Sequence, residues 1–85
     1  MDARLFVSNL SMITGPEVLL RLFEVYGEVV EVRMIDGQGA AYVEFASEDA
    51  AQGAIDGANG AKVNGRSIRV GASRVRSIGS AGGRR

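Results

Sequence analysis

The sequence contains no cysteine and no histidine. Without cysteine there is no disulfide framework, and without either residue the usual zinc sites and histidine acid–base catalysis are excluded. No apolar run approaches the length of a membrane-spanning helix, and the first residues show no signal-peptide pattern. We therefore expect no metal site and no membrane partner.

Acidic and basic residues are equal in number, but they are unevenly distributed. Residues 1–71 hold six basic and ten acidic residues, a net charge of −4, whereas residues 72–85 hold four arginines and no acid. The first segment has the apolar content of a globular domain, and the second consists mainly of Gly, Ser, Ala and Arg. We predict one folded domain over residues 1–71, followed by a flexible basic tail over residues 72–85.

Hydrophobic periodicity predicts four strands and two helices. A helix begins at the capping pattern of Thr14 and Glu17, carries an apolar stripe with a spacing of three and four residues, and ends at Gly27. A second helix is capped by Ser47 and runs to about Asp56. Apolar residues alternate with other residues in the strands, which are expected at 4–10, 29–36, 40–45 and 66–71.

The resulting order, β-α-β-β-α-β, predicts an α+β fold of the ferredoxin-like kind. Two helices would cover one face of a four-stranded antiparallel sheet and leave the other face open to solvent. Alternation then separates the side chains of the first and third strands. Leu5, Val7, Ala41, Val43 and Phe45 should face the helices, and the open face should carry Phe6, Ala40, Tyr42 and Glu44.

Two short motifs resemble those of the RNA recognition motif (RRM) family. Residues 5–10 (LFVSNL) are similar to its six-residue motif, and residues 38–45 (QGAAYVEF) to its eight-residue motif. The resemblance covers residues 4–71, and the short turn after the second strand is similar to that of SR-type splicing factors and related mRNA-processing proteins. It implies a monomeric module that binds single-stranded RNA in RNA processing or mRNA metabolism, without a cofactor and without enzymatic activity. It also implies a nuclear location ahead of a cytoplasmic one.

The resemblance implies that Phe6 and Tyr42 stack RNA bases. Gln38 stands where the family usually has a basic residue and Ala40 where it usually has an aromatic one, so we expect weak binding. Arginines that alternation places on the open face could replace the lost charge, although Glu31 would oppose them. The candidate RNA-binding residues are Arg4, Phe6, Asn9, Arg33, Gln38, Ala40, Tyr42, Glu44, Arg69, Arg74 and Arg76.

The sequence also bears on functions other than RNA binding. Single-stranded DNA is an alternative ligand, because stacking does not distinguish the sugars. A protein-interaction module is the main rival, favoured by the acidic body and by the missing aromatic residue. An acylphosphatase-like enzyme of similar strand order is disfavoured, because residues 11–15 offer no arginine for a phosphate-binding loop. The arginines of the open face could also simply pair with neighbouring glutamates.

Overall fold

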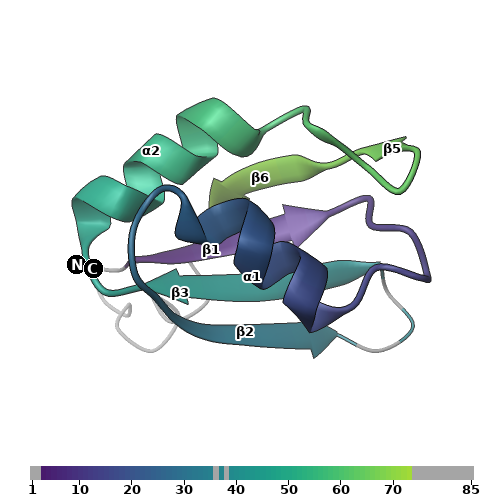
Figure 1. Cartoon of the computed structure of the whole chain (residues 1–85), viewed down its shortest axis with the longest axis horizontal. Coiled ribbons are helices and arrows are strands. Elements are labelled where there is room, and N and C mark those ends of the chain that lie inside the picture. The colour runs from purple at the N-terminus through teal and green to yellow at the C-terminus, as the bar shows by residue number, and fades with distance from the viewer. Residues whose placement is uncertain (1–2, 36, 38, 74–85) are drawn as a thin grey trace, which may run out of the picture.

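A computed structural model describes residues 3–35, 37 and 39–73 of the chain. The sheet has the strand order β2-β3-β1-β6, all neighbours are antiparallel, and both helices cover one of its faces (Figure 1). This confirms the ferredoxin-like prediction. Neither helix is long and apolar enough to cross a membrane, within the described residues. The elements are β1 (Arg4–Ser8), α1 (Pro16–Glu24), β2 (Val29–Ile35), β3 (Ala40–Phe45), α2 (Glu48–Ala58), β4 (Lys62–Val63), β5 (Arg66–Ser67) and β6 (Arg69–Ala72).

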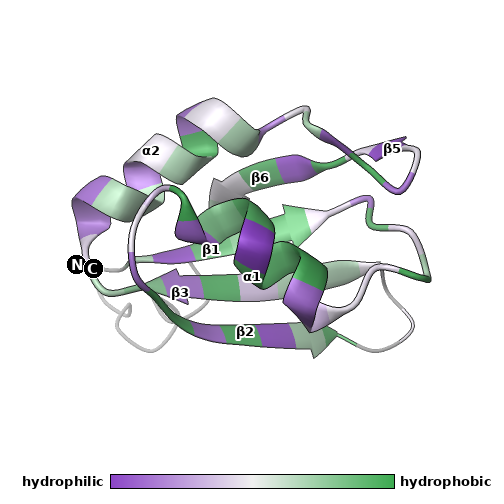
Figure 2. Cartoon of the chain, viewed as in Figure 1, coloured by the Kyte–Doolittle hydropathy of each residue, from purple (hydrophilic) through white to green (hydrophobic). Residues whose placement is uncertain are grey.

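The hydrophobic core lies between the sheet and the helices. Alternate residues of the two central strands point into it, and polar and apolar residues alternate along β2 and β3 in Figure 2. Phe23 of α1 meets Phe45 of β3 edge to face, with the ring centroids 6.2 Å apart. The buried side chains of α2 are small, those of Ala51, Ala54 and Ala58, while Ile55 packs against the core partly buried.

The last predicted strand, at residues 66–71, is interrupted in the structure. Arg66–Ser67 pairs with Lys62–Val63 in a small hairpin, and Arg69–Ala72 pairs with β1. The break falls at Ile68, whose N–H donates to the carbonyl of Ala61 and whose side chain is buried. Val70 is buried as well, so the inward direction predicted for both residues is correct.

The other predicted boundaries differ by one or two residues. Strand β1 stops at Ser8 rather than residue 10, because Asn9 takes a left-handed backbone conformation with φ of 62°. Helix α2 continues to Ala58, and its predicted cap is confirmed, since the Ser47 hydroxyl accepts from the N–H of Ala50. The predicted end of the second strand, Asp36, lies outside the described residues.

The predicted side-chain cap of α1 is wrong. Gly15 is the N-cap residue, and no side chain caps the helix. The hydroxyl of Thr14 instead accepts a hydrogen bond of 2.9 Å from the side-chain amide of Asn64. Thr14 is buried. Its hydrogen bond with Asn64 connects the segment before α1 to the turn between β4 and β5.

Glycines let the segment that follows α1 approach α2 closely. A Cβ atom at Gly27 would lie 2.5 Å from the Cβ of Ala50, so only glycine fits beside α2 at that position. The ring of Tyr26 lies against α2 in the same way, because a Cβ at Gly57 would lie 2.5 Å from its hydroxyl oxygen. At Gly53 the same ring is 3.9 Å from the position of a Cβ, which is an ordinary contact distance.

These distances predict opposite effects of two Gly→Ala substitutions in α2. Gly53→Ala should raise the free energy of unfolding by about 0.5–1 kcal/mol, because alanine is the better helix former and fits the space. Gly57→Ala should instead be less stable than Gly53→Ala by about 1–3 kcal/mol, because the added methyl group must displace the Tyr26 ring. Urea denaturation of both variants measures the difference, and an equal gain for both would contradict the contact.

Candidate nucleic-acid interface

Two aromatic rings lie on the face of the sheet that the helices leave uncovered, which we call the open face. Phe6 of β1 and Tyr42 of β3 are cross-strand partners, and their ring centroids are 5.4 Å apart at an interplanar angle of 56°. Phe6 retains 37% of its accessible surface, whereas its chain neighbours Leu5 and Val7 are buried. The alternation of β1 therefore holds an apolar ring in solvent at the centre of the sheet.

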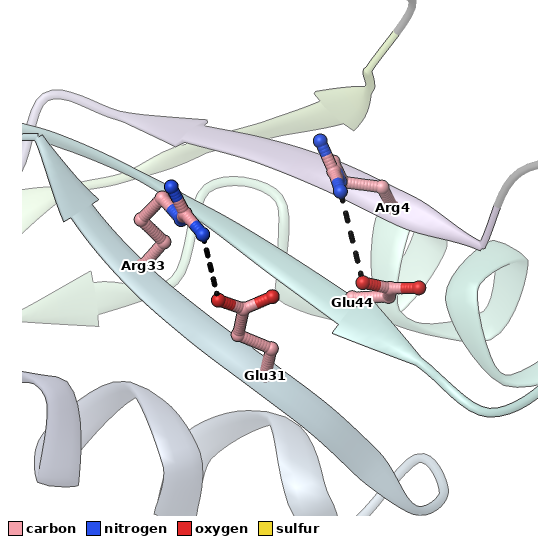
Figure 3. Close-up of polar contacts among 4 residues, drawn as sticks. All are labelled: Arg4, Glu31, Arg33 and Glu44. Carbon is pink, nitrogen blue, oxygen red and sulfur yellow. Dashed lines mark hydrogen bonds and ion pairs between the residues drawn. The ribbon is translucent and has the colours of Figure 1, made fainter. Parts of the chain in front are cut away.

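Four charged side chains form two close pairs on β1, β2 and β3 (Figure 3). A guanidinium nitrogen of Arg4 is 3.7 Å from a carboxylate oxygen of Glu44, and one of Arg33 is 3.2 Å from Glu31. The two glutamates are direct cross-strand partners. Like charges in that position repel and destabilise the pairing of the two strands. The two arginines offset this repulsion between the carboxylates. The four residues have no net charge.

This pairing changes what Arg4 and Arg33 offer to a phosphate. All four side chains are substantially exposed, so each ion pair contributes little to stability and can open. A phosphate must nevertheless compete with a carboxylate for each arginine. Arg69 is different: it lies opposite Ser8 of β1, is exposed, and forms no ion pair within the described part of the chain. Among the described residues of the open face, Arg69 is therefore the arginine most available to a phosphate.

Two other predicted site residues offer less to a ligand than their positions suggest. Ala40 shares the face of Tyr42, but its small side chain is only 5% exposed beside its cross-strand partner Ile35, so it offers little surface to a ligand. The side chain of Asn9 is occupied within the chain. Its amide donates to the carbonyl of Ser67 and its oxygen accepts from Arg66, both at 2.8 Å.

Three predicted site residues, Gln38, Arg74 and Arg76, lie outside the described residues. Sequence reasoning missed Arg66, which the hydrogen bond to Asn9 places at the end of β1 beside the open face. No local pattern signals this position, because the hydrogen bond joins residues 57 apart in the sequence. In the described part of the chain, no three potential metal-ligating side chains come together.

The contacts of Asn9 predict that it stabilises the fold. Asn9→Ala should lower the free energy of unfolding by about 2 kcal/mol, because it removes two hydrogen bonds and puts alanine in a left-handed conformation. Arg66→Ala is the matched comparison and should cost only about 0.5 kcal/mol, since the bond from Asn9 to Ser67 survives. Equal losses in chemical denaturation would show that Asn9 is not the anchor of this loop.

Comparison with known proteins identifies the family. The family model described as RNA recognition motif matches residues 5–69, and the chain belongs to that family. The organelle RRM domain-containing protein 1, chloroplastic, of Zea mays is 39% identical over 87% of this chain and 20% of its own length. Glycine-rich RNA-binding protein 10 of Brassica napus is 35% identical over 98% of this chain and 53% of its own length.

A solved structure agrees with the sequence relatives. The Sex-lethal RNA recognition domains 1 and 2 from Drosophila melanogaster superimpose with a TM-score of 0.80 at 30% identity, covering 91% of this chain and 53% of theirs. The chain thus spans between a fifth and about half of the lengths of these proteins. One relative is named as chloroplastic, and the nuclear location expected from the resemblance finds no support among them.

Proposed function

We propose that the open face binds single-stranded RNA, with bases stacked on Phe6 and Tyr42. The observation that carries the proposal is the ring pair itself: two aromatic side chains, 5.4 Å apart, on the uncovered face of a sheet whose other face is the core. An exposed phenylalanine favours association with a ligand, because its burial removes apolar surface from water. Family membership supports RNA as that ligand.

The energetics of this surface favour modest affinity. Each base stacked on a ring contributes roughly 1–3 kcal/mol, whatever its identity. Ala40 provides no third ring, and residues 1–71 carry a net charge of −4, which repels a polyanion at long range. Arg69 on the sheet and the arginines of residues 72–85 would supply the phosphate contacts. Single-stranded DNA would bind the same rings, with contacts to the 2′-hydroxyl deciding between the two ligands.

The wider role that we propose is that of a monomeric module in RNA processing or mRNA metabolism, without catalytic activity. The sequence relatives are named as glycine-rich and organelle proteins, so they do not favour the specific likeness to SR-type splicing factors. We propose that the chain consists of a folded domain followed by a basic tail. We propose Ser73 as the end of the folded domain, because β6 runs to Ala72 and the Ser73 N–H donates to the carbonyl of Arg4.

Removing either ring tests the stacking proposal. Phe6→Ala and Tyr42→Ala should each weaken binding of a short RNA by about 1–3 kcal/mol, measured by calorimetry, while the circular dichroism spectrum stays that of the parent. Val25→Ala is the control, because it trims an exposed apolar side chain at the end of α1, away from the open face. Ring variants that bind RNA as tightly as the parent would exclude the stacking platform.

A protein-interaction module remains the second candidate, since the paired charges and the acidic body weaken attraction to RNA. Titration with oligonucleotides separates the two functions. An amide spectrum that does not move with RNA or single-stranded DNA oligonucleotides would favour a protein ligand. Shifts that cluster on β1 and β3 would favour the nucleic acid.

The basic tail should contribute a salt-dependent part of the affinity. Truncation after Ser73 removes four arginines and keeps the β6 pairing intact. Binding should weaken similarly for different RNA sequences, because phosphate contacts carry no sequence information. For every phosphate that the tail neutralises, truncation should flatten the slope of log affinity against log salt by about 0.7. An unchanged slope would assign the phosphate contacts to the sheet.

A further inference from the structure

The open face carries a second row of side chains next to the rings. Phe6 pairs with Tyr42 across β1 and β3, and Arg4 pairs with Glu44 one step further along the same two strands. Residues two apart on a strand point to the same face and are separated by about 6.6 Å. A base stacked on the rings therefore has the Arg4–Glu44 row beside its edge. A shallow depression lined by both residues and by Tyr42 marks this place.

Arg4 connects the two rows. Its guanidinium carbon lies 5.8 Å from the centroid of the Tyr42 ring, and its nitrogen lies 3.7 Å from Glu44. The side chain thus points hydrogen-bond donors into the space between ring and carboxylate. Because guanidinium has five donors, Arg4 can keep its contact with Glu44 and still donate to a ligand.

Glu44 is the less engaged of the two glutamates on this face. Glu31 accepts a hydrogen bond of 3.2 Å from Arg33, whereas the 3.7 Å contact of Glu44 with Arg4 is too long for one. Glu44 also lies on the central strand, two residues from Tyr42, while Glu31 lies on the edge strand. Its carboxylate can therefore accept hydrogen bonds from a base with both oxygens.

Among the four RNA bases, guanine has the edge that matches this arrangement. Its N1–H and its amino group are two adjacent donors for one carboxylate, and the neighbouring O6 is an acceptor for an arginine. Adenine and cytosine each present a single amino group there, next to ring acceptors. Uracil presents one N–H between two carbonyl oxygens, which would face the carboxylate and be repelled.

We propose that Glu44, with Arg4, forms a base-edge site that selects guanine at the nucleotide stacked beside it. The inference rests on the proposed RNA binding and adds a preference to it. It also explains a feature that phosphate binding does not: a carboxylate close to the rings hinders a polyanion, yet it is a strong acceptor for base donors. Glu44 thus lowers the affinity for RNA in general and raises the preference for one base.

The test uses the full chain and a uridine heptanucleotide whose central position is guanosine, inosine, adenosine, cytidine or uridine. Inosine is guanosine without the amino group, so the pair isolates the second hydrogen bond to the carboxylate. The guanosine probe should bind about tenfold more tightly than the inosine probe, as expected for a bidentate contact. The adenosine, cytidine and uridine probes should be no tighter than inosine.

Glu44→Gln keeps the shape of the side chain and removes the second acceptor. It should reduce the guanosine-to-inosine ratio to within about twofold, while binding of the all-uridine probe is retained or improved because a negative charge is removed. Glu24→Gln is the charge-matched control: it removes one exposed carboxylate at the end of α1 and should keep the tenfold ratio.

The outcomes separate this inference from the proposed function. Equal binding of all five probes to the parent chain would overturn guanine selection and leave RNA binding intact. No binding of any probe would overturn the proposed function. A tenfold ratio that survives in Glu44→Gln would assign the preference to another residue. If that variant loses the amide spectrum of the parent, the ratio measured on the unchanged chain still decides whether guanine is selected.

Discussion

The antiparallel pairing of β1 with β3 is the constraint on which both faces of the domain depend. These two strands lie at the centre of the sheet, and their register joins Leu5 to Val43 on one side and Phe6 to Tyr42 on the other. A slip of one residue would send the rings into the core and the core residues into solvent. Core packing therefore fixes the position of the rings, and the binding surface gains its rigidity from contacts on the opposite face.

Much of this arrangement could be predicted from local patterns. Alternation in residues 4–8 and 40–45 identifies which side chains face the helices, because a strand has a period of two. Alternation gave the right direction for Ile68, but it did not predict the break there, where the backbone bonds to Ala61 and divides one predicted strand in two. The capping pattern failed at Thr14, whose hydroxyl bonds to Asn64, fifty residues away. Both failures involve hydrogen bonds to residues outside the predicted element, which a pattern within one element does not encode.

In the candidate site, too, the sequence pattern predicts the face on which a side chain lies but not the contacts that it makes with other strands. Alternation correctly places Arg4, Arg33 and Glu44 on one face, yet it does not say which charges pair. The pairing follows from cross-strand geometry and turns four formal charges into a neutral group beside the rings. The burial of Ala40 and the internal bonds of Asn9 also depend on neighbours from other strands. From residue type alone, the paired charged residues, Ala40 and Asn9 would all be expected to be available to a ligand.

The strand order has a consequence for the way the chain acquires its fold. β1 is the first strand of the sheet to be synthesised, but both of its partners, β3 and β6, come later in the sequence. During synthesis both edges of β1 lack a partner until residues 40–45 have emerged, and one edge stays unpaired until residues 69–72 follow. Contacts between such distant segments form slowly. During that interval the aromatic and aliphatic residues of β1 are open to wrong partners. The first strand to be made is thus the last to be fully paired.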